Sequence, residues 1–506
     1  MPKLFTFSNE WIAFAVFLFA IFTTITLAEI ARKYFQWRAE FSRKLVHVLV
    51  GVLLTFSPFI LTTATPAILL GILFTIINYF ALKSKIFAGM HATERISYGT
   101  VYFPLAFILV IALYWDRNPA VMLTALLILT FADTAASIVG EQLVYPKSFV
   151  FWQDRKTRLG SFTFFITAFI IVLVFFSFFY GLAEVESSPL PLSFLLILGV
   201  IVALLSMLAE SASRQGSDNL TLTLAAALSL DLTLNSYTAH SLPEFAGWIL
   251  FSAALGWVAF KWRLLTAGGG VGAFVLGVFM FGMGGWPFMV PLITFFGLSS
   301  LLSKLSDHRR PNLYHVNEKG SNRDIIQVYA NGGIALLVTI AWNFLGDPLL
   351  YTVFLASLAA AMSDTWETEL GRLSRVNPRH IITWKPVVKG YSGGISLPGT
   401  LGGILGAFVI GVIGYLFHPG LMAFPQFILI TAGSGFLASL VDSLLGATIQ
   451  AKFACTICGK ETEKRNHCGA PAVLIGGIRK IDNDWVNIIC TASGALFALL
   501  LLRIFS

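Results

Sequence analysis

The sequence predicts an all-α polytopic membrane protein with about 16 transmembrane helices, in two parallel-repeat halves of about eight each. Of its 506 residues, 57% are hydrophobic and 12% are charged, against about 25% charged in soluble proteins. The mean hydropathy is +0.79, and apolar runs of about 20 residues recur along the whole chain. Because the net charge of +8 resides in short loops, it indicates membrane topology and no nucleic-acid partner.

Apolar runs predict the spans in chain order. We expect them to be centred near residues 18, 53, 73, 106, 129, 171, 199, 226, 252, 277, 294, 335, 358, 405, 435 and 495. The first run, residues 9–28, lacks the small-residue cleavage site of a secretory signal and therefore predicts an uncleaved span.

The loop charges predict the orientation of the spans. Loops that follow odd-numbered spans carry 31 of the 34 Lys and Arg residues, and the exceptions are Lys3, Arg117 and Arg503. Because cytoplasmic loops are enriched in these residues, we expect the basic loops in the cytoplasm and both termini outside. The protein is expected in a membrane, the inner membrane if the cell is bacterial.

Two similar motifs, 231 residues apart, indicate two similar sites. Asp133-Thr134 is followed by Gly140 at a spacing of seven, and Asp364-Thr365 by Gly371 at the same spacing. A basic loop with Gly and Ser follows each motif. An acid that can hold Mg²⁺, beside cations and backbone N–H groups, suits phosphoryl transfer. We therefore expect two domains, residues 1–236 and 237–506, each with one site.

The first half contains polar residues at positions where lipid is expected. Asp133 ends a long apolar run, so we interpret it as a Mg²⁺ ligand or an acceptor of an alcohol proton. Asp218 is a second candidate metal ligand, or alternatively a helix cap. Candidate nucleotide and phosphate contacts are Arg43, Lys44, His47, Lys156, Gly160, Ser161 and Asn219. Arg43, Lys44 and His47 could instead be interfacial cations that only extend toward water.

These motifs resemble the dolichol kinase/phytol kinase family of CTP-dependent membrane lipid kinases. The resemblance rests on residues 43–47 (RKLVH), 133–140 (DTAASIVG), 156–161 (KTRLGS) and 210–220, and covers about residues 40–230. It implies that the first half phosphorylates an isoprenoid alcohol. The chain departs from the family at Leu159, where a Glu usually precedes Gly-Ser, and this puts an acid at that point in doubt.

The second half carries more acids and more cations. Candidate catalytic residues are Asp364, Glu369 and Asp442, and candidate Mg²⁺ ligands are Asp364, Glu367 and Asp482. Glu367 shares a helix face with Asp364, whereas Glu369 is expected to point elsewhere. Candidate phosphate contacts are Lys304, Asn331, Lys385, Lys389, Ser392, Gly393, Gly394 and Ser396. The acids and cations could alternatively form only an interfacial salt-bridge network, and the Gly- and Ser-rich segment 390–396 could be only a flexible turn.

This half resembles the membrane family, of DUF92 type, whose plant and cyanobacterial members act as phytyl-phosphate kinases, with an animal relative similar to transmembrane protein 19. The matching stretches are residues 331–333, 364–371, 389–396, 399–400, 442–447 and 482–487. The resemblance covers about residues 245–505 and implies that this half converts a prenyl monophosphate to the diphosphate.

A predicted cytoplasmic loop, residues 448–484, contains Cys455, Cys458, His467 and Cys468 in the pattern C-x₂-C-x₈-H-C. Because the cytosol disfavours disulfides, we expect either a structural zinc knuckle or ordinary reduced thiols.

The sequence is therefore interpreted as a bifunctional isoprenoid salvage kinase. It would convert a phytol-, geranylgeraniol- or farnesol-like alcohol to the monophosphate and then to the diphosphate, with Mg²⁺ and CTP or another nucleoside triphosphate. The lipid bilayer, the prenyl substrates and the nucleotide are the expected partners. The alternatives are a secondary transporter of an anionic lipid or metabolite, and a cytidylyltransferase-like lipid enzyme. A transporter would fit the Gly-rich helices, but the charged motifs lie at one membrane face.

Overall fold

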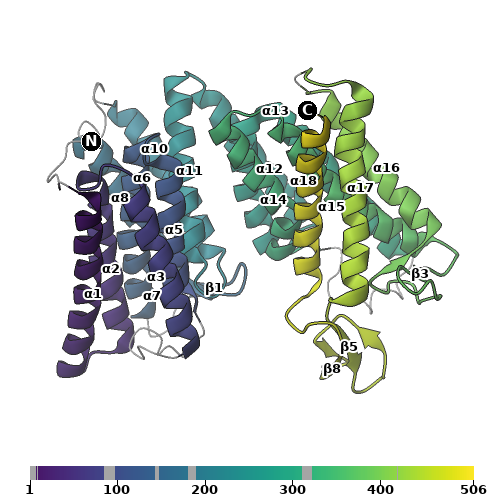
Figure 1. The fold of residues 1–506 in the computed structure, drawn as a ribbon, viewed down its shortest axis with the longest axis horizontal. Coiled ribbons are helices and arrows are strands. Elements are labelled where there is room, and N and C mark those ends of the chain that lie inside the picture. Colours follow the sequence, from purple (N-terminus) through teal and green to yellow (C-terminus); the bar gives the residue numbers. More distant parts are fainter. Residues whose placement is uncertain are drawn as a thin grey trace. The chain divides into compact units, whose positions relative to one another are not determined.

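A computed structural model describes residues 7, 9–84, 97–142, 147–179, 190–309, 322–418 and 420–505. The chain forms two compact units, Met1–Ala246 and Gly247–Ser506, and helices dominate both (Figure 1). The boundary expected near residue 236 falls inside helix α11 (Asp218–Thr238), and the units divide just inside α12 (Leu242–Lys261). The helical pattern of α11 therefore continues past the expected boundary.

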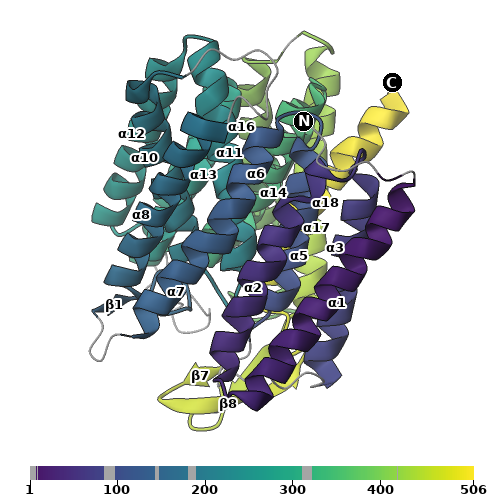
Figure 2. The ribbon, with the colours of Figure 1, turned by 90° about the vertical axis from the view of Figure 1, so that its left-hand side faces the viewer.

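The first unit is built mainly from helices that run alongside one another (Figure 2). Besides α11, its elements are α1 (Glu10–Tyr34), α2 (Ala39–Thr55), η1 (Ser57–Phe59), α3 (Thr65–Ser84), α5 (Gly99–Tyr114), α6 (Pro119–Leu127), η2 (Ile128–Ala132), α7 (Asp133–Glu141), β1 (Ser148–Phe149), β2 (Lys156–Thr157), α8 (Arg158–Val174), η3 (Phe175–Phe179) and α10 (Leu192–Ser211). Helix α8 packs on α7 and α10, α10 packs on α11, and α1 packs on α2 and α3.

One helix of this unit is interrupted by a π-helical turn. The segments α6, η2 and α7 are continuous, and η2 has π-helical geometry. Asp133 is the first residue after this turn. Single π turns inside α-helices are frequent at functional sites, and this one directly precedes the acid that the sequence singles out.

The second unit contains α13 (Ala267–Arg309), α14 (Ile325–Leu345), α15 (Leu350–Leu373), β3 (Arg379–His380), β4 (Gly394–Ile395), α16 (Leu397–Tyr415), α17 (Phe424–Thr448), β5 (Lys452–Cys455), β6 (Glu461–Thr462), β7 (Asn466–His467), β8 (Ala470–Gly476) and α18 (Asn483–Phe505), as well as most of α12. Helix α15 is its centre, because α13, α14, α16, α17 and α18 all pack on it.

Small residues allow this close packing around α15. All residues from Tyr351 to Ser363 are buried, as expected for a helix that is apolar on every side. A Cβ atom added to Gly435 of α17 would lie 2.6 Å from the Cβ of Ala359, and one added to Gly494 of α18 would lie 2.8 Å from that of Ala360. The backbones can approach because these side chains are minimal.

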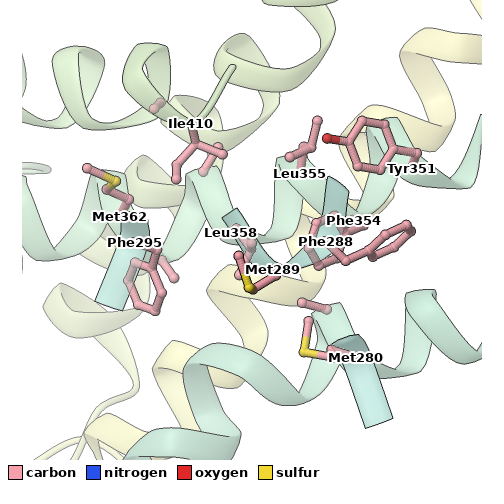
Figure 3. Close-up of a cluster of buried hydrophobic side chains, with 14 of the residues drawn as sticks. Met280, Phe288, Met289, Phe295, Tyr351, Phe354, Leu355, Leu358, Met362 and Ile410 are labelled. Carbon is pink, nitrogen blue, oxygen red and sulfur yellow. The ribbon is translucent and has the colours of Figure 1, made fainter. Parts of the chain in front are cut away.

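Larger side chains fill the part of this core near the start of α15 (Figure 3). The Phe288 ring of α13 lies 4.5 Å from the Phe354 ring and 5.3 Å from the Tyr351 ring, measured between centroids. The Tyr351 hydroxyl lies 3.2 Å from the Pro287 carbonyl and 3.1 Å from that of Gly414. Tyr351 therefore satisfies its polar atom while its ring stays in the apolar core.

Helix α13 is bent at one glycine. Its 43 residues contain Gly285 at φ 58° and ψ −147°, and Pro287 and Pro291 follow within the next six residues. Glycine adopts this positive φ at little cost, and proline interrupts helical hydrogen bonding. The two runs centred near 277 and 294 are therefore two helical segments that meet at the non-helical Gly285.

Eleven of the described helices are long and apolar enough to cross a membrane, with the bent α13 counted once. The chain is thus an all-α polytopic membrane protein, apart from a few short strands. Each of the sixteen expected centres falls in a helix, but the number of crossings, the parallel repeat and the orientation stay predictions. Lys3 lies outside the described residues.

The expected Cys/His loop contains a small antiparallel sheet, which the sequence reading did not predict. Its strand order is β6-β5-β8-β7, and it continues from the end of α17 (Figure 1). Two of its four strands are only two residues long, too short for a periodic pattern in the sequence.

Candidate active sites

The first unit encloses a cavity of about 870 Å³, here called the first cavity. Every candidate of the first half lines it: Arg43, Lys44, His47, Asp133, Lys156, Gly160, Ser161, Asp218 and Asn219. These residues come from α2, α7, β2, α8 and α11. The fold thus gathers four sequence motifs at one place.

Three acids meet in this cavity. Asp133 begins α7, Glu210 lies at the end of α10, and Asp218 begins α11. One carboxylate oxygen from each acid lies within 4.8 Å of one from each of the other two. Glu210 is 4% exposed. Carboxylates held so close repel each other unless a cation or a proton lies between them.

Lys156 supplies part of that positive charge. Its Nζ donates to Asp218 at 2.9 Å and to Glu210. Burial alone would lower the pKa of Lys156, but the carboxylates of Asp218 and Glu210 outweigh it and raise this pKa above its usual value. Lys156 is therefore a permanent cation of the site.

A surrounding layer of hydrogen bonds holds several of these elements in place. The His47 Nε2–H donates to the Leu129 carbonyl at 3.1 Å, inside the π-helical turn. Asn219 Nδ2 donates to the Gly99 carbonyl at 2.9 Å. Ser211 donates to Glu210 at 3.2 Å, and the hydroxyls of Ser161 and Ser211 lie 3.4 Å apart.

Two expected phosphate contacts already have partners within the chain. Gly160 N–H donates to the Thr157 hydroxyl at 3.1 Å, which caps α8. A Cβ atom added to Gly160 would lie 3.0 Å from the Ala136 carbonyl, so this glycine is explained by the approach of α7 to α8. Lys44 forms an ion pair with Glu141 at the edge of the cavity.

The departure at Leu159 does not alter the acidic group. Its side chain is 45% exposed and is not among the described residues that line the first cavity. Glu210, which the sequence reading quoted only as part of a motif, is the third acid. An acid at the end of the apolar run of α10 was the signal that could have identified it.

The second unit contains a more polar cavity of about 230 Å³, here called the second cavity. It is lined by Asn331 of α14, by Asp364, Glu367 and Glu369 of α15, by Asp442 of α17, and by Lys389, Ser392, Gly393, Gly394 and Ser396 of the loop before α16. The expectation that Glu369 points elsewhere is wrong, because it lines the same cavity and pairs with Arg372 at 3.4 Å.

Acidic oxygens without protein partners characterise this cavity. The Asp364 and Asp442 carboxyl groups are hydrogen-bonding partners. Glu367 Oε1 and Asp442 Oδ1 are buried and have no hydrogen-bond partner among the described residues. Glu367 is 7% exposed. Buried, unsatisfied carboxylate oxygens are costly unless a ligand completes them, and oxygen ligands of this kind suit Mg²⁺.

Cations stand opposite these acids. Arg323, which was not recognised from the sequence, lines the cavity together with Arg372 and Lys389. Burial lowers the pKa of Arg323, whereas Glu369 and Asp364 act to raise it. Its guanidinium lies 5.7 Å from the Phe295 ring centroid. Asp484 of α18, which the sequence analysis did not single out, also lines the cavity, together with Asn487.

Three candidate ligands of phosphate or Mg²⁺ are not among the described residues that line the second cavity. Lys304 donates to the Trp262 carbonyl at 2.7 Å. Lys385 is exposed in the loop after β3. Asp482 lies 3.8 Å from Arg465. It directly precedes α18, and Asp484 in the first turn of that helix lines the second cavity instead of Asp482.

Gly393 allows the loop to approach α17. It has φ +87°, and an added Cβ would lie 2.5 Å from the Cβ of Ala447. Gly393→Ala is therefore expected to destabilise the protein by about 2 kcal/mol or more, seen as a lower unfolding temperature in detergent. Gly297→Ala is the control, because no atom lies within 4 Å of its added Cβ. Equal unfolding temperatures for the two variants would contradict this account.

Comparison with known proteins identifies the family of the second unit. Residues 250–495 match the family described as Integral membrane protein DUF92. Protein PGR of Arabidopsis thaliana is 30% identical over 265 residues, which cover 48% of this chain and 90% of that protein.

Two further relatives are more distant. A phytol kinase of Synechocystis sp. is 25% identical over 219 residues, 43% of this chain and 90% of the relative. Protein VTE6, chloroplastic, of Arabidopsis thaliana is 27% identical over 148 residues, 29% of this chain and 37% of that protein. No solved structure matches the chain significantly. With 30% identity across nine-tenths of PGR and the matching family profile, the chain belongs to the DUF92 family of integral membrane proteins.

Proposed function

We propose that this protein is a membrane prenol kinase with two sites. The first cavity would phosphorylate a prenyl alcohol, and the second would phosphorylate the resulting monophosphate. The observation that carries the proposal is the acidic group with Lys156 inside a cavity that also has an apolar wall. The similarity to a phytol kinase supports the same class of substrate.

The first cavity is suited to an amphiphile. Its apolar wall includes Ile21, Ile25, Val50, Leu54, Leu70, Phe74, Phe103 and Phe107. A prenyl chain would bury its hydrocarbon against these residues, at about 25 cal/mol per Å² of apolar surface. Its hydroxyl would then lie at the polar end, near the three acids.

The residues of the first cavity can carry out one phosphoryl transfer. The alcohol oxygen would bond to the γ-phosphorus of CTP or another nucleoside triphosphate, the bond from that phosphorus to the bridging oxygen would break, and the nucleoside diphosphate would leave. Asp133 would accept the alcohol proton. It suits this role because, within the described structure, Lys156 bonds to Glu210 and Asp218 and not to Asp133.

Mg²⁺ fits both cavities. In the first, three carboxylates face one ammonium group, which leaves negative charge for a divalent ion. In the second, Glu367, Asp442 and Asp364 offer oxygens, two of which have no hydrogen-bond partner among the described residues. When bound, Mg²⁺ would offset the charge of the transferred phosphoryl group.

The second cavity suits a substrate that is already anionic. Its nucleophile would be a phosphate oxygen, so no strong base is needed and cations become more important. Arg323, Arg372 and Lys389 provide them. An apolar cavity of about 100 Å³, which includes Leu276 and Phe296, shares Arg323, Gln327 and Asn331 with the second cavity. A prenyl tail could begin there while its phosphate faces the acids and cations.

The direct test uses the purified full-length chain in detergent, with Mg²⁺ and radiolabelled geranylgeraniol. Product would be followed over time with CTP, and with ATP in parallel. We expect monophosphate first and diphosphate later, with release of nucleoside diphosphate. No phosphorylation of prenol or prenyl phosphate with any nucleotide would overturn the proposal in favour of a transporter. Release of pyrophosphate would indicate nucleotidyl transfer instead.

A further inference from the structure

Four soft metal ligands converge in the small sheet of the second unit. Cys455 ends β5, Cys458 lies in the turn after it, and His467 and Cys468 lie at the end of β7. Their ligand atoms all lie within 4.8 Å of one another. The cysteines are free thiols. Two segments separated by β6 thus bring their ligating atoms to one point.

The backbone is arranged around these sulfur atoms. Cys455 Sγ accepts hydrogen bonds from the backbone N–H groups of Ile457 at 3.4 Å and Cys458 at 3.5 Å. The turn therefore directs two backbone N–H groups at a sulfur atom that lies within 4.8 Å of the other three ligand atoms.

The adjacent His467 and Cys468 can both face the same point. His467 Nδ1 lies 3.2 Å from Cys468 Sγ and 3.6 Å from Cys458 Sγ. Cys468 has a positive φ of 54°, which turns its side chain back toward that of its neighbour. With Zn–S bonds of about 2.3 Å, ligand atoms of a tetrahedral zinc site lie about 3.5–4 Å apart, close to these separations.

The sheet contacts the loop that lines the second cavity. Glu463, which follows β6, accepts hydrogen bonds from the Ser392 hydroxyl and from Gln450 Nε2, the latter at 3.0 Å. Lys452 of β5 donates to the Tyr391 hydroxyl at 2.9 Å, and its Nζ lies 4.1 Å from the Tyr391 ring centroid. Glu463 itself lines the second cavity.

We propose that Cys455, Cys458, His467 and Cys468 bind a structural Zn²⁺, and that the sheet it stabilises holds the loop 390–394 in its position at the second cavity. Strands of two to seven residues form a sheet that is marginal alone, and metal binding supplies folding free energy directly. The zinc is thus a structural element, and Glu463 is a positioning residue.

The metal site is tested without any enzyme assay. Full-length protein, purified without chelator, is expected to contain about one zinc ion per chain by elemental analysis. Cys458→Ser is expected to reduce that content about tenfold, whereas Cys490→Ser keeps it, because Cys490 lies in α18 and its Sγ is 3.4 Å from the Ala438 carbonyl. Protein exchanged into Co²⁺ should show thiolate-to-cobalt absorption. Wild-type protein without zinc, and without that absorption, would overturn the proposal.

The positioning role rests on the proposed function and has its own readout. Glu463→Ala is expected to speed amide hydrogen exchange in residues 390–394 and to lower kcat/KM of the second phosphorylation about tenfold, with zinc content and the first phosphorylation retained. Glu463→Gln should restore both, since its amide oxygen can accept the same bonds, and exposed Glu461→Ala is the control.

The outcomes separate this inference from the proposed function. Unchanged exchange in Glu463→Ala would overturn the positioning role whatever the enzyme does. If wild-type protein phosphorylates no prenol but contains zinc and shows the exchange effect, the proposed function fails and the zinc-stabilised sheet stands.

Discussion

Asp133→Asn is expected to abolish formation of prenyl monophosphate, with a loss of about 100-fold or more in kcat/KM. Asparagine keeps the size of the side chain but can neither accept the alcohol proton nor supply a full negative charge to Mg²⁺. Because Asp133 shares its site with Glu210 and Asp218, removing one of three mutually repelling charges should not unfold the unit. The measurement is the initial rate with radiolabelled geranylgeraniol and CTP.

The control is Asp116→Asn, which makes the same chemical change at an exposed position. It should retain the wild-type rate. Exogenous prenyl monophosphate should still be converted to the diphosphate by Asp133→Asn, because the second cavity is intact. Monophosphate formation at the wild-type rate in Asp133→Asn would exclude the first cavity as the kinase site.

Asp364→Asn is expected to cause the opposite pattern, in which monophosphate accumulates and diphosphate falls about 100-fold or more. Asp364 is the hydrogen-bonding partner of Asp442 and lines the second cavity with Glu367. Its charge would be needed to hold Mg²⁺ against the phosphates of both nucleotide and substrate. The measurement is the ratio of diphosphate to monophosphate over time, starting from the alcohol.

Asp347→Asn is the matched control in this unit. Asp347 is exposed, and its carboxylate accepts a hydrogen bond from the Leu349 N–H at 2.9 Å, which asparagine can also accept. Its product ratio should equal that of the wild type. If Asp364→Asn produced diphosphate normally while Asp133→Asn produced nothing, both phosphorylations would belong to the first cavity.

The helical architecture could be predicted from the sequence because burial in lipid requires long apolar runs, and these runs are visible without tertiary information. Features that depend on contacts between distant segments or on a single backbone angle could not be predicted. The bend at Gly285 depends on one φ angle, and the small sheet depends on pairing between strands that carry no periodic signal. The domain boundary expected near residue 236 falls inside α11 for a related reason, since polar residues near Asn235 look like a boundary although the helix continues to Thr238.

The site residues were predictable where a charge interrupts an apolar run, as at Asp133, Asp364 and Asp442. Their partners were harder to recognise. Arg323 lies just before a helix start, where a basic residue is unremarkable, and only the fold brings it toward Asp364 and Glu369. Lys304 and Lys385 show the converse case, because proximity in sequence to a motif did not bring them to the cavity that the described residues form.

The π-helical turn before Asp133 also changes the angular register of its helix. Each residue of an α-helix advances by about 100°, and a single π turn accommodates about one extra residue. A helical wheel drawn from Pro119 without the π turn would therefore give Asp133 an angular position that is wrong by about 100°. The apolar segment α6 and the polar segment α7 follow two separate registers, so one continuous helix can bury α6 among its neighbours and still direct its acid toward Glu210 and Asp218.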